Sequence, residues 1–307
     1  MTAPVSVDGP TGSIYDIGYR GYEGQRLGRA HAIRSLFEHS VRNSFGLGRG
    51  ARAKIGPITI GALALLPAVA LVGILTLASR FGERVEELLI GQAPIAYNTY
   101  FATITIPLIL FCAAQAPELF GRDQRHGVLS LYFARALRRS DYAIARLAGF
   151  VAALMILQLL PNLVMFIGRV LISPDILEGL RREVAPLPAV IGQVLLSSGL
   201  LGSLAMVVSA FTPRRAYATA GIIALFLIPS IVASVVTGFG SSGIGPWLIL
   251  TSPTSALDGT NAVLFDTSFE SAFFFVSLPG WAYFAAVLGG IAGAVVITIR
   301  RFARIAT

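Results

Sequence analysis

Charged residues are scarce in this chain: they make up 13% of its 307 residues, whereas soluble domains carry about 25%. Hydrophobic residues make up 55%, and the mean hydropathy is +0.73. This composition excludes an ordinary soluble domain, because such a domain needs a polar surface. Uninterrupted apolar stretches of about 20 residues predict instead an all-α membrane protein that crosses the bilayer several times.

Cysteine and lysine are almost absent as well. Cys112 is the only cysteine, which excludes an intrachain disulfide. Lys54 is the only lysine, and no G-x-x-x-x-G-K-[ST] motif occurs, so we expect ATP to bind another chain. The H-E-x-x-H and G-x-S-x-G motifs are also missing. We therefore expect no enzyme, and no catalytic, cofactor-binding or metal-binding residue in this chain.

Six apolar runs are predicted to span the membrane, over about residues 55–79, 95–116, 147–173, 187–211, 217–237 and 280–299. Most of the 24 basic residues fall before the first run, between the second and third, between the fourth and fifth, and after the last. The positive-inside rule then places both termini in the cytoplasm. The net charge of +8 has the same explanation, so we expect no nucleic-acid partner.

A few polar residues lie inside the predicted spans. Arg169 stands about one turn from the outer end of the third, where its side chain is expected to reach the headgroups rather than a substrate. Gln115, Gln158, Asn162 and Gln193 either join helices or line a path, and the sequence leaves both alternatives open.

The residues before the first span divide into two parts. Residues 1–28 are rich in Tyr, Gly and Arg without an apolar period, which predicts a flexible cytoplasmic tail. Residues 29–54 are predicted to hold an amphipathic helix and a linker to the transmembrane domain, residues 55–307. The apolar stripe of this helix, expected in the membrane interface, consists of Ile33, Phe37, Val41 and Phe45. Packing on a soluble partner is the alternative.

A charged segment separates the second and third spans. "GRDQRHG" between Gly121 and Gly127 predicts a turn, and "VLSLYFARAL" after it predicts a short helix with one apolar face. Ser140 is the expected N-cap of the third span, with Asp141 in its first turn. On the residues alone this segment is either an interfacial helix or a docking site for another protein.

The segment "APELFGRDQRHGVLSLYFARALRRSDYAIARLAG" resembles the permease subunit of bacterial type-2 ABC exporters, as does the order of elements along most of the chain. The resemblance implies a coupling helix, meaning a cytoplasmic helix between spans two and three that sits in a groove of a separate ATPase. It further implies a bacterial cytoplasmic membrane, ATP and Mg bound by the partner ATPase, and a dimer with a second copy or a related permease. The implied ATPase contacts are Glu118, Arg122, Asp123, Arg125, Tyr132, Arg135, Arg138 and Arg139.

Residues 238–279 carry no Lys or Arg. Two apolar pieces, about 243–250 and 272–278, are too short to span a bilayer. The resemblance implies short re-entrant or surface helices that form an outer gate, whereas the residues alone equally allow an ordinary loop with one surface helix.

The function expected from these features is that of a membrane permease in an ATP-driven exporter. Sparse charge within the spans favours an amphiphilic or apolar cargo, such as a drug, a lipid or a lipid-linked molecule. The alternatives are an ATP-independent secondary transporter and a non-transport scaffold or assembly subunit. The sequence identifies no residue of the substrate pathway.

Overall fold

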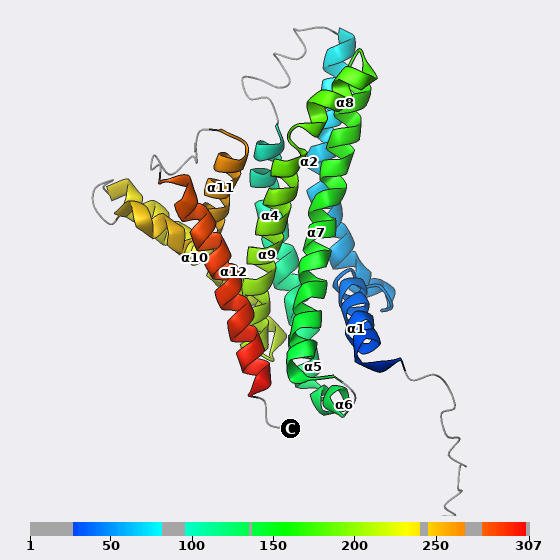
Figure 1. Ribbon diagram of the computed structural model, residues 1–307, viewed down its shortest axis with the longest axis vertical. Helices are drawn as coiled ribbons and strands as arrows, with labels where there is room; N and C mark the ends of the chain where they lie inside the picture. Colours follow the sequence, from blue (N-terminus) through cyan, green and yellow to red (C-terminus); the bar gives the residue numbers. More distant parts are fainter. Residues whose placement is uncertain (1–26, 82–95, 135–136, 240–244, 268–277, 305–307) are drawn as a thin grey trace, which may run out of the picture.

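The computed structural model describes residues 27–81, 96–134, 137–239, 245–267 and 278–304, and every element in these ranges is helical (Figure 1). The predicted all-α membrane fold is thereby confirmed. Most of the predicted tail, Arg135, and most of the apolar piece 272–278 lie outside the described residues.

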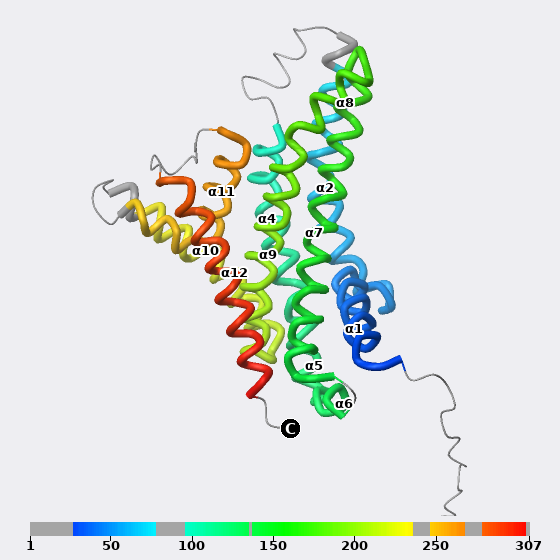
Figure 2. Tube along the Cα trace, in the orientation of Figure 1, coloured from blue at the N-terminus to red at the C-terminus, as the bar shows by residue number. Residues whose placement is uncertain are grey.

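Six of the described helices are long and apolar enough to cross a membrane, as predicted. They are α2 (Ala51–Phe81), α4 (Tyr97–Ala116), α7 (Arg139–Ile172), α9 (Leu187–Phe211), α10 (Arg215–Phe239) and α12 (Gly280–Ala303). α7 packs against α2, α9 and α12, and α9 also packs against α4 (Figure 2). The stacked rings of Phe111 and Phe150, 6.1 Å apart, lie in the core between α4 and α7.

The third span begins earlier than its apolar run indicated. α7 starts at Arg139, with Arg138 as its N-cap, so the prediction that Ser140 caps this helix is wrong. The Asp141 carboxylate accepts a hydrogen bond from the Arg138 backbone N–H at 3.0 Å, which satisfies one of the free donors at the helix start. Two charged turns thus precede the apolar part of the same helix.

The helix predicted over residues 29–45 is present as α1 (Gly28–Ser44), and it lies along α7. Its buried face carries Leu36, Ser40, Asn43 and Ser44. Only a glycine allows this approach, because a Cβ on Gly149 of α7 would lie 2.5 Å from the Ser40 Cβ. In the predicted apolar stripe, Ile33 and Phe45 pack against the protein core while Phe37 and Val41 are half-buried. Their contact with lipid stays a prediction.

The connection between α4 and α7 differs from the prediction. The chain continues helically from α4 through the π-helix η1 (Pro117–Gly121) into α5 (Arg122–Arg125), so the turn predicted from Gly121 to Gly127 is wrong in its first half. The chain reverses only at His126 and Gly127, where Gly127 has a φ of +65°. The short helix predicted over VLSLYFARAL, residues 128–137, is confined to α6 (Leu129–Phe133). The helix continues past Gly121 because the acids Glu118 and Asp123 form ion pairs with residues of other segments.

Three further helical segments lie outside the six long helices and away from α5 and α6. α8 (Ile176–Val184), which the sequence did not predict, follows α7. Between α10 and α12, the 3-10 helix η2 (Gly245–Thr251) and α11 (Pro253–Leu264) form a helical hairpin packed against α9, α10 and α12. At its tip, the Ser252 hydroxyl lies 2.9 Å from that of Ser230, well inside α10. This hairpin, residues 245–264, packs among the long helices instead of standing apart from them, and its entry into the membrane stays a prediction.

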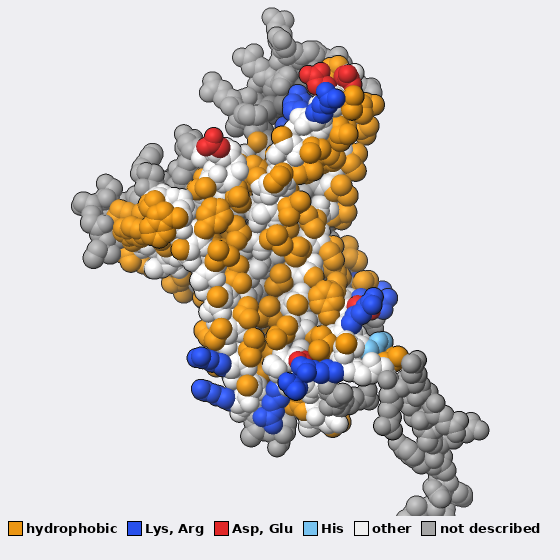
Figure 3. All heavy atoms as spheres, viewed as in Figure 1, with side chains coloured by type: hydrophobic (Ala, Val, Ile, Leu, Met, Phe, Trp, Pro, Cys, Tyr) orange, Lys and Arg blue, Asp and Glu red, His pale blue; other side chains and the backbone are white. Residues whose placement is uncertain are grey.

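The two ends of the bundle differ in charge. We call the end that holds α1, α5, α6 and the last turn of α12 the basic end, because Lys and Arg side chains gather there (Figures 1 and 3). We call the end that holds α8 and the C-terminal end of α11 the far end (Figure 1).

Candidate functional site

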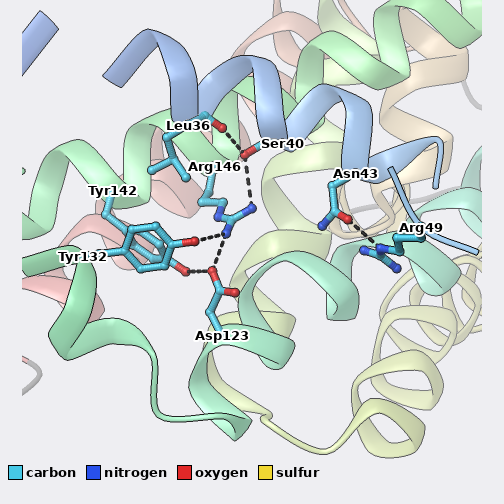
Figure 4. A network of polar contacts seen from close by, with 8 residues as sticks. All are labelled: Leu36, Ser40, Asn43, Arg49, Asp123, Tyr132, Tyr142 and Arg146. Atoms are coloured by element: carbon cyan, nitrogen blue, oxygen red, sulfur yellow. Dashed lines mark hydrogen bonds and ion pairs between the residues drawn. The ribbon is translucent and has the colours of Figure 1, made fainter. Parts of the chain in front are cut away.

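The centre of the basic end is a buried arginine. Arg146, in the second turn of α7, is only 1% exposed. Its guanidinium forms an ion pair with Asp123 of α5, and donates hydrogen bonds to the Tyr132 hydroxyl at 3.2 Å and to the Ser40 hydroxyl at 3.5 Å (Figure 4). The Tyr142 hydroxyl also donates to Asp123, at 2.7 Å. One charge pair therefore joins α1, α5, α6 and α7.

Aromatic rings complete the surroundings of this cation. The Arg146 guanidinium lies 5.7 Å from the centre of the Tyr142 ring and 5.8 Å from that of Tyr132. Such cation–π contacts contribute about 1 kcal/mol or more when desolvated. A charge this deeply buried is stable only when it is paired and hydrogen-bonded. The contacts of Arg146 therefore hold the surrounding helices together.

A second ion-pair group lies beside the first. The Glu118 carboxylate of η1 binds Arg49 at 3.0 Å and Arg215, the first residue of α10, at 2.9 Å. Arg49, in the linker between α1 and α2, also donates to the Asn43 side chain at 2.6 Å (Figure 4). Burial lowers the pKa of Arg49, and the neighbouring Glu118 acts against this effect. η1 is thereby tied to α10 as well as to the α1–α2 linker.

A third contact reaches the start of α1. Arg29 forms a bidentate pair with Asp141 of α7, at 2.6 and 2.7 Å, and this pair raises the pKa of Arg29. The Asp141 carboxylate, which accepts a hydrogen bond at the start of α7, therefore also holds the N-terminal end of α1. All three groups converge on the connection between α4 and α7.

The predicted ATPase contacts fall into two sets. Glu118 and Asp123 face inward and are bound within the chain, and the hydroxyl of Tyr132 bonds Arg146. Arg139 lies over the Phe133 ring at 5.8 Å and donates to the Ala303 carbonyl at 3.4 Å. The set exposed at the surface consists of Arg122, Arg125 and Arg138. Arg135 lies outside the described residues.

Sequence reasoning missed the central cation. The apolar run that predicts the third span starts at about residue 147, so it leaves Arg146 outside the span. The overlooked signal is helical spacing: Tyr142, Arg146 and Phe150 recur every four residues, which places the arginine on the apolar face if the helix begins at Arg139. Arg49 and Arg215 carried no comparable signal, because their shared partner Glu118 is distant in sequence.

Two of the interior polar residues, Gln158 and Gln193, join helices. Gln158 of α7 accepts from Ser197 and donates to Ser198, both at 2.7 Å on α9. Gln193 of α9 donates to the Leu257 carbonyl of α11 at 3.1 Å and accepts from Thr260 at 3.2 Å. Of the two alternatives left open by the sequence, the helix-joining one is observed for Gln158 and Gln193.

At the far end, Arg169 pairs with a residue of α8. Its Nε lies 3.5 Å from the Glu183 carboxylate, and its guanidinium lies 5.3 Å from the centre of the Tyr97 ring. The Tyr97 hydroxyl donates to the same carboxylate at 3.0 Å. With 23% of its side chain exposed, Arg169 stands at the edge of an open cleft of about 580 Å³.

Within the described ranges, no group of three or more His, Cys, Asp or Glu side chains is placed to hold a metal ion. Neither the protein-family models nor the curated proteins give a match to this chain. The site is therefore defined by its geometry: a π-helix, a short helix and a reversed chain, held by buried ion pairs at the basic end of a six-span helical membrane protein.

Proposed function

We propose that this chain is the membrane permease subunit of an ATP-driven exporter of the type-2 ABC class, and that its α5–α6 segment docks on a separate ATPase. One observation carries the proposal. The acids Glu118 of η1 and Asp123 of α5 are bound inside the chain, whereas Arg122 and Arg125 of α5 and Arg138, the N-cap of α7, are exposed at the basic end. The segment thus offers a basic surface on a rigid base, as a coupling helix requires.

The ion pairs supply a route for force. A movement of α5 acts on α7 and α1 through Asp123 and Arg146, and on α10 through Glu118 and Arg215. Buried ion pairs resist separation, because an unpaired charge in a low-dielectric interior is costly. ATP and Mg bound by the partner would close two ATPase subunits, and the docked segment would carry the helices with it.

The exposed helices support a dimer, formed with a second copy or with a related permease. Within the most apolar stretch of each helix, 61% of the residues are buried in α4 and α9, against 17% in α2 and 22% in α10. Side chains such as Leu227, Ile228 and Ile231 leave α10 with an open apolar face. A second permease and the lipid bilayer together would cover these faces, with an amphiphilic or apolar cargo passing between the two permeases.

The proposal is tested by purifying the tagged chain in mild detergent with its bound proteins, from wild type and from the double variant Arg125→Glu plus Arg138→Glu. Both arginines are exposed, so charge reversal leaves the internal ion pairs in place. We expect an ATP-hydrolysing partner to accompany the wild type and to be lost from the variant.

The matched control is Arg42→Glu plus Arg52→Glu, which reverses the same charge on exposed residues of α1 and α2. It should retain the partner, because the contact is local to α5–α6. A wild type that brings down no nucleotide-binding protein would contradict the proposal and favour the scaffold or the secondary transporter. Loss of the partner from both variants equally would indicate a general effect of charge.

A further inference from the structure

A carboxylate lies within the bundle, on the hairpin of residues 245–264. Asp258 lies in the middle of α11, next to Leu257, whose carbonyl accepts a hydrogen bond from Gln193 of α9 at 3.1 Å. α11 also packs against α4, α10 and α12. The acidic residue that the sequence placed in an outer segment therefore lies among the transmembrane helices.

A small cavity adjoins this carboxylate. Its volume is about 10 Å³, which leaves space for a single particle the size of a water molecule. Apolar residues such as Phe101 and Leu108 form one part of its wall. The polar lining consists of Thr105, Gln158, Gln193, Ser197, Asp258 and Asn261.

Another residue that lines this cavity, Asn261, has an unused acceptor. Asn261, one turn after Asp258, is 8% exposed, and its amide N–H donates to the Asn98 carbonyl at 2.9 Å. The amide oxygen of Asn261 has no hydrogen-bond partner within the described part of the chain. A buried acceptor left unpaired costs about 1–3 kcal/mol, so this oxygen calls for a donor or a cation.

Asp258 also lacks a counter-charge. In the ranges the structure describes, it forms no ion pair, and η2, α4 and α9 contribute no charged residue around α11. Asp258 is half-buried, and the loss of water around its carboxyl raises the pKa of this group to about 6. The remaining charged or titratable residues on the helices packed against α11 are Tyr97, Tyr100, Cys112, Arg215, Tyr217, Tyr283, Arg300 and Arg301. The arginines among them lie at the basic ends of their helices.

A carboxylate that is packed among apolar helices without a counter-charge is costly unless it is neutralised. A protein cation would have to come from the neighbouring helices, and the described ones place none there. We propose that Asp258 and the amide oxygen of Asn261 form a binding site for one small monovalent cation, either a proton on the carboxylate or a sodium ion between the two oxygens. Both occupants fit a space of one water, and both remove the buried charge.

Occupancy of the site links cation binding to the position of the hairpin. With the site filled, α11 packs as observed; with the site empty, the charged carboxylate favours a position nearer to water. This inference does not depend on an ATPase partner, so its failure and that of the proposed function are distinguishable.

The site is tested by labelling the full chain in lipid nanodiscs with dicyclohexylcarbodiimide, which reacts with protonated carboxyl groups in apolar surroundings. Labelled peptides are identified by mass spectrometry between pH 5 and 8. At pH 6 we expect Asp258 to label roughly tenfold or more above the exposed Asp266, because an ordinary exposed carboxyl is almost wholly ionised there. Asp258→Asn should remove this labelled peptide alone.

Replacing choline chloride with sodium chloride identifies the occupant. Protection of Asp258 by sodium indicates a sodium site, whereas an unchanged rate indicates a proton site. Labelling no faster than that of Asp266 at every pH would overturn the proposal when wild type and Asp258→Asn also unfold with the same pH dependence. The second measurement is the pH dependence of unfolding. Wild type should lose stability relative to Asp258→Asn as the pH rises through about 6. Parallel pH profiles of the two proteins would overturn the proposal even if the reagent did not reach Asp258.

Discussion

The basic end and the hairpin of residues 245–264 differ in how their charged side chains are paired. At the basic end, Arg146 is matched by Asp123, and Glu118 lies between Arg49 and Arg215. In the hairpin, Asp258 has no protein counter-charge among the described residues, and its neighbours offer only neutral amides and hydroxyls. At the basic end, ion pairs within the chain neutralise the charges. In the hairpin, Asp258 needs a cation that the described part of the chain does not supply.

This difference indicates different mechanical properties. Separating a buried ion pair exposes two uncompensated charges, so the basic end should move as one body. The hairpin is held by neutral hydrogen bonds, such as that from Gln193 to the Leu257 carbonyl, and each contributes about 1 kcal/mol net. Neutral bonds are exchanged for water at low cost, so the hairpin is the part suited to open and close.

The largest effect is expected from breaking the central pair. Arg146→Met should lower the free energy of unfolding by about 3–5 kcal/mol, because it leaves Asp123 inside without its cation. Unfolding of the purified protein in mixed micelles measures this loss. The double variant Arg146→Met plus Asp123→Asn should recover much of it. Equal stability of Arg146→Met and wild type would show that the pair does not hold the basic end together.

The next effect has the opposite sign and depends on pH. The Asp258 carboxyl has a pKa raised to about 6 in the folded protein, so the stability it contributes is present below its unfolded pKa of about 4 and lost as the pH rises through about 6. Asp258→Asn should thus be more stable than wild type by up to about 3 kcal/mol at pH 8, at 1.36 kcal/mol per unit. The gap should close below pH 4. Thermal unfolding across this range checks it, with Asp266→Asn as the exposed control.

The smallest effect should separate the contact between α1 and α7 from the charge pairs. Gly149→Ala places a methyl group 2.5 Å from the Ser40 Cβ and 2.9 Å from the Phe37 carbonyl oxygen, and overpacking of this kind costs about 1–3 kcal/mol. Trypsin should then cut sooner at the exposed Arg42 in α1. Gly289→Ala is the matched control, because nothing lies within 4 Å of the added methyl group. Equal cleavage rates in the two variants would show that α1 is not held by this close approach.

The sequence predicted most of the fold from local features. Apolar runs gave the six spans, and four-residue spacing gave α1, because hydrophobic length and period are properties of short segments. The same method failed where polar residues continue a helix. It ended the second span before the charges of η1 and α5, and it started the third span after Arg146, because charge in isolation indicates a loop.

The candidate site was predicted only in part. The segment from Glu118 to Arg139 was identified, yet the division into inward acids and outward arginines was not. That division depends on Arg49 and Arg215, which lie far from Glu118 in sequence and reach it only in the folded bundle. The paired partner of a buried charge is a long-range property, so no local pattern reveals it.

The sequence by itself determined that this protein is a six-span helical membrane protein with a basic side, because the bilayer accepts only long apolar helices and the charge between them is written residue by residue. The tertiary structure alone decided which charges are satisfied. It brought Arg146 of α7 to Asp123 of α5. It also packed residues 245–264 among the spans, so that Asp258 lies beside a cavity. The physical reason is that the cost of a charge depends on its surroundings, and only packing defines those surroundings.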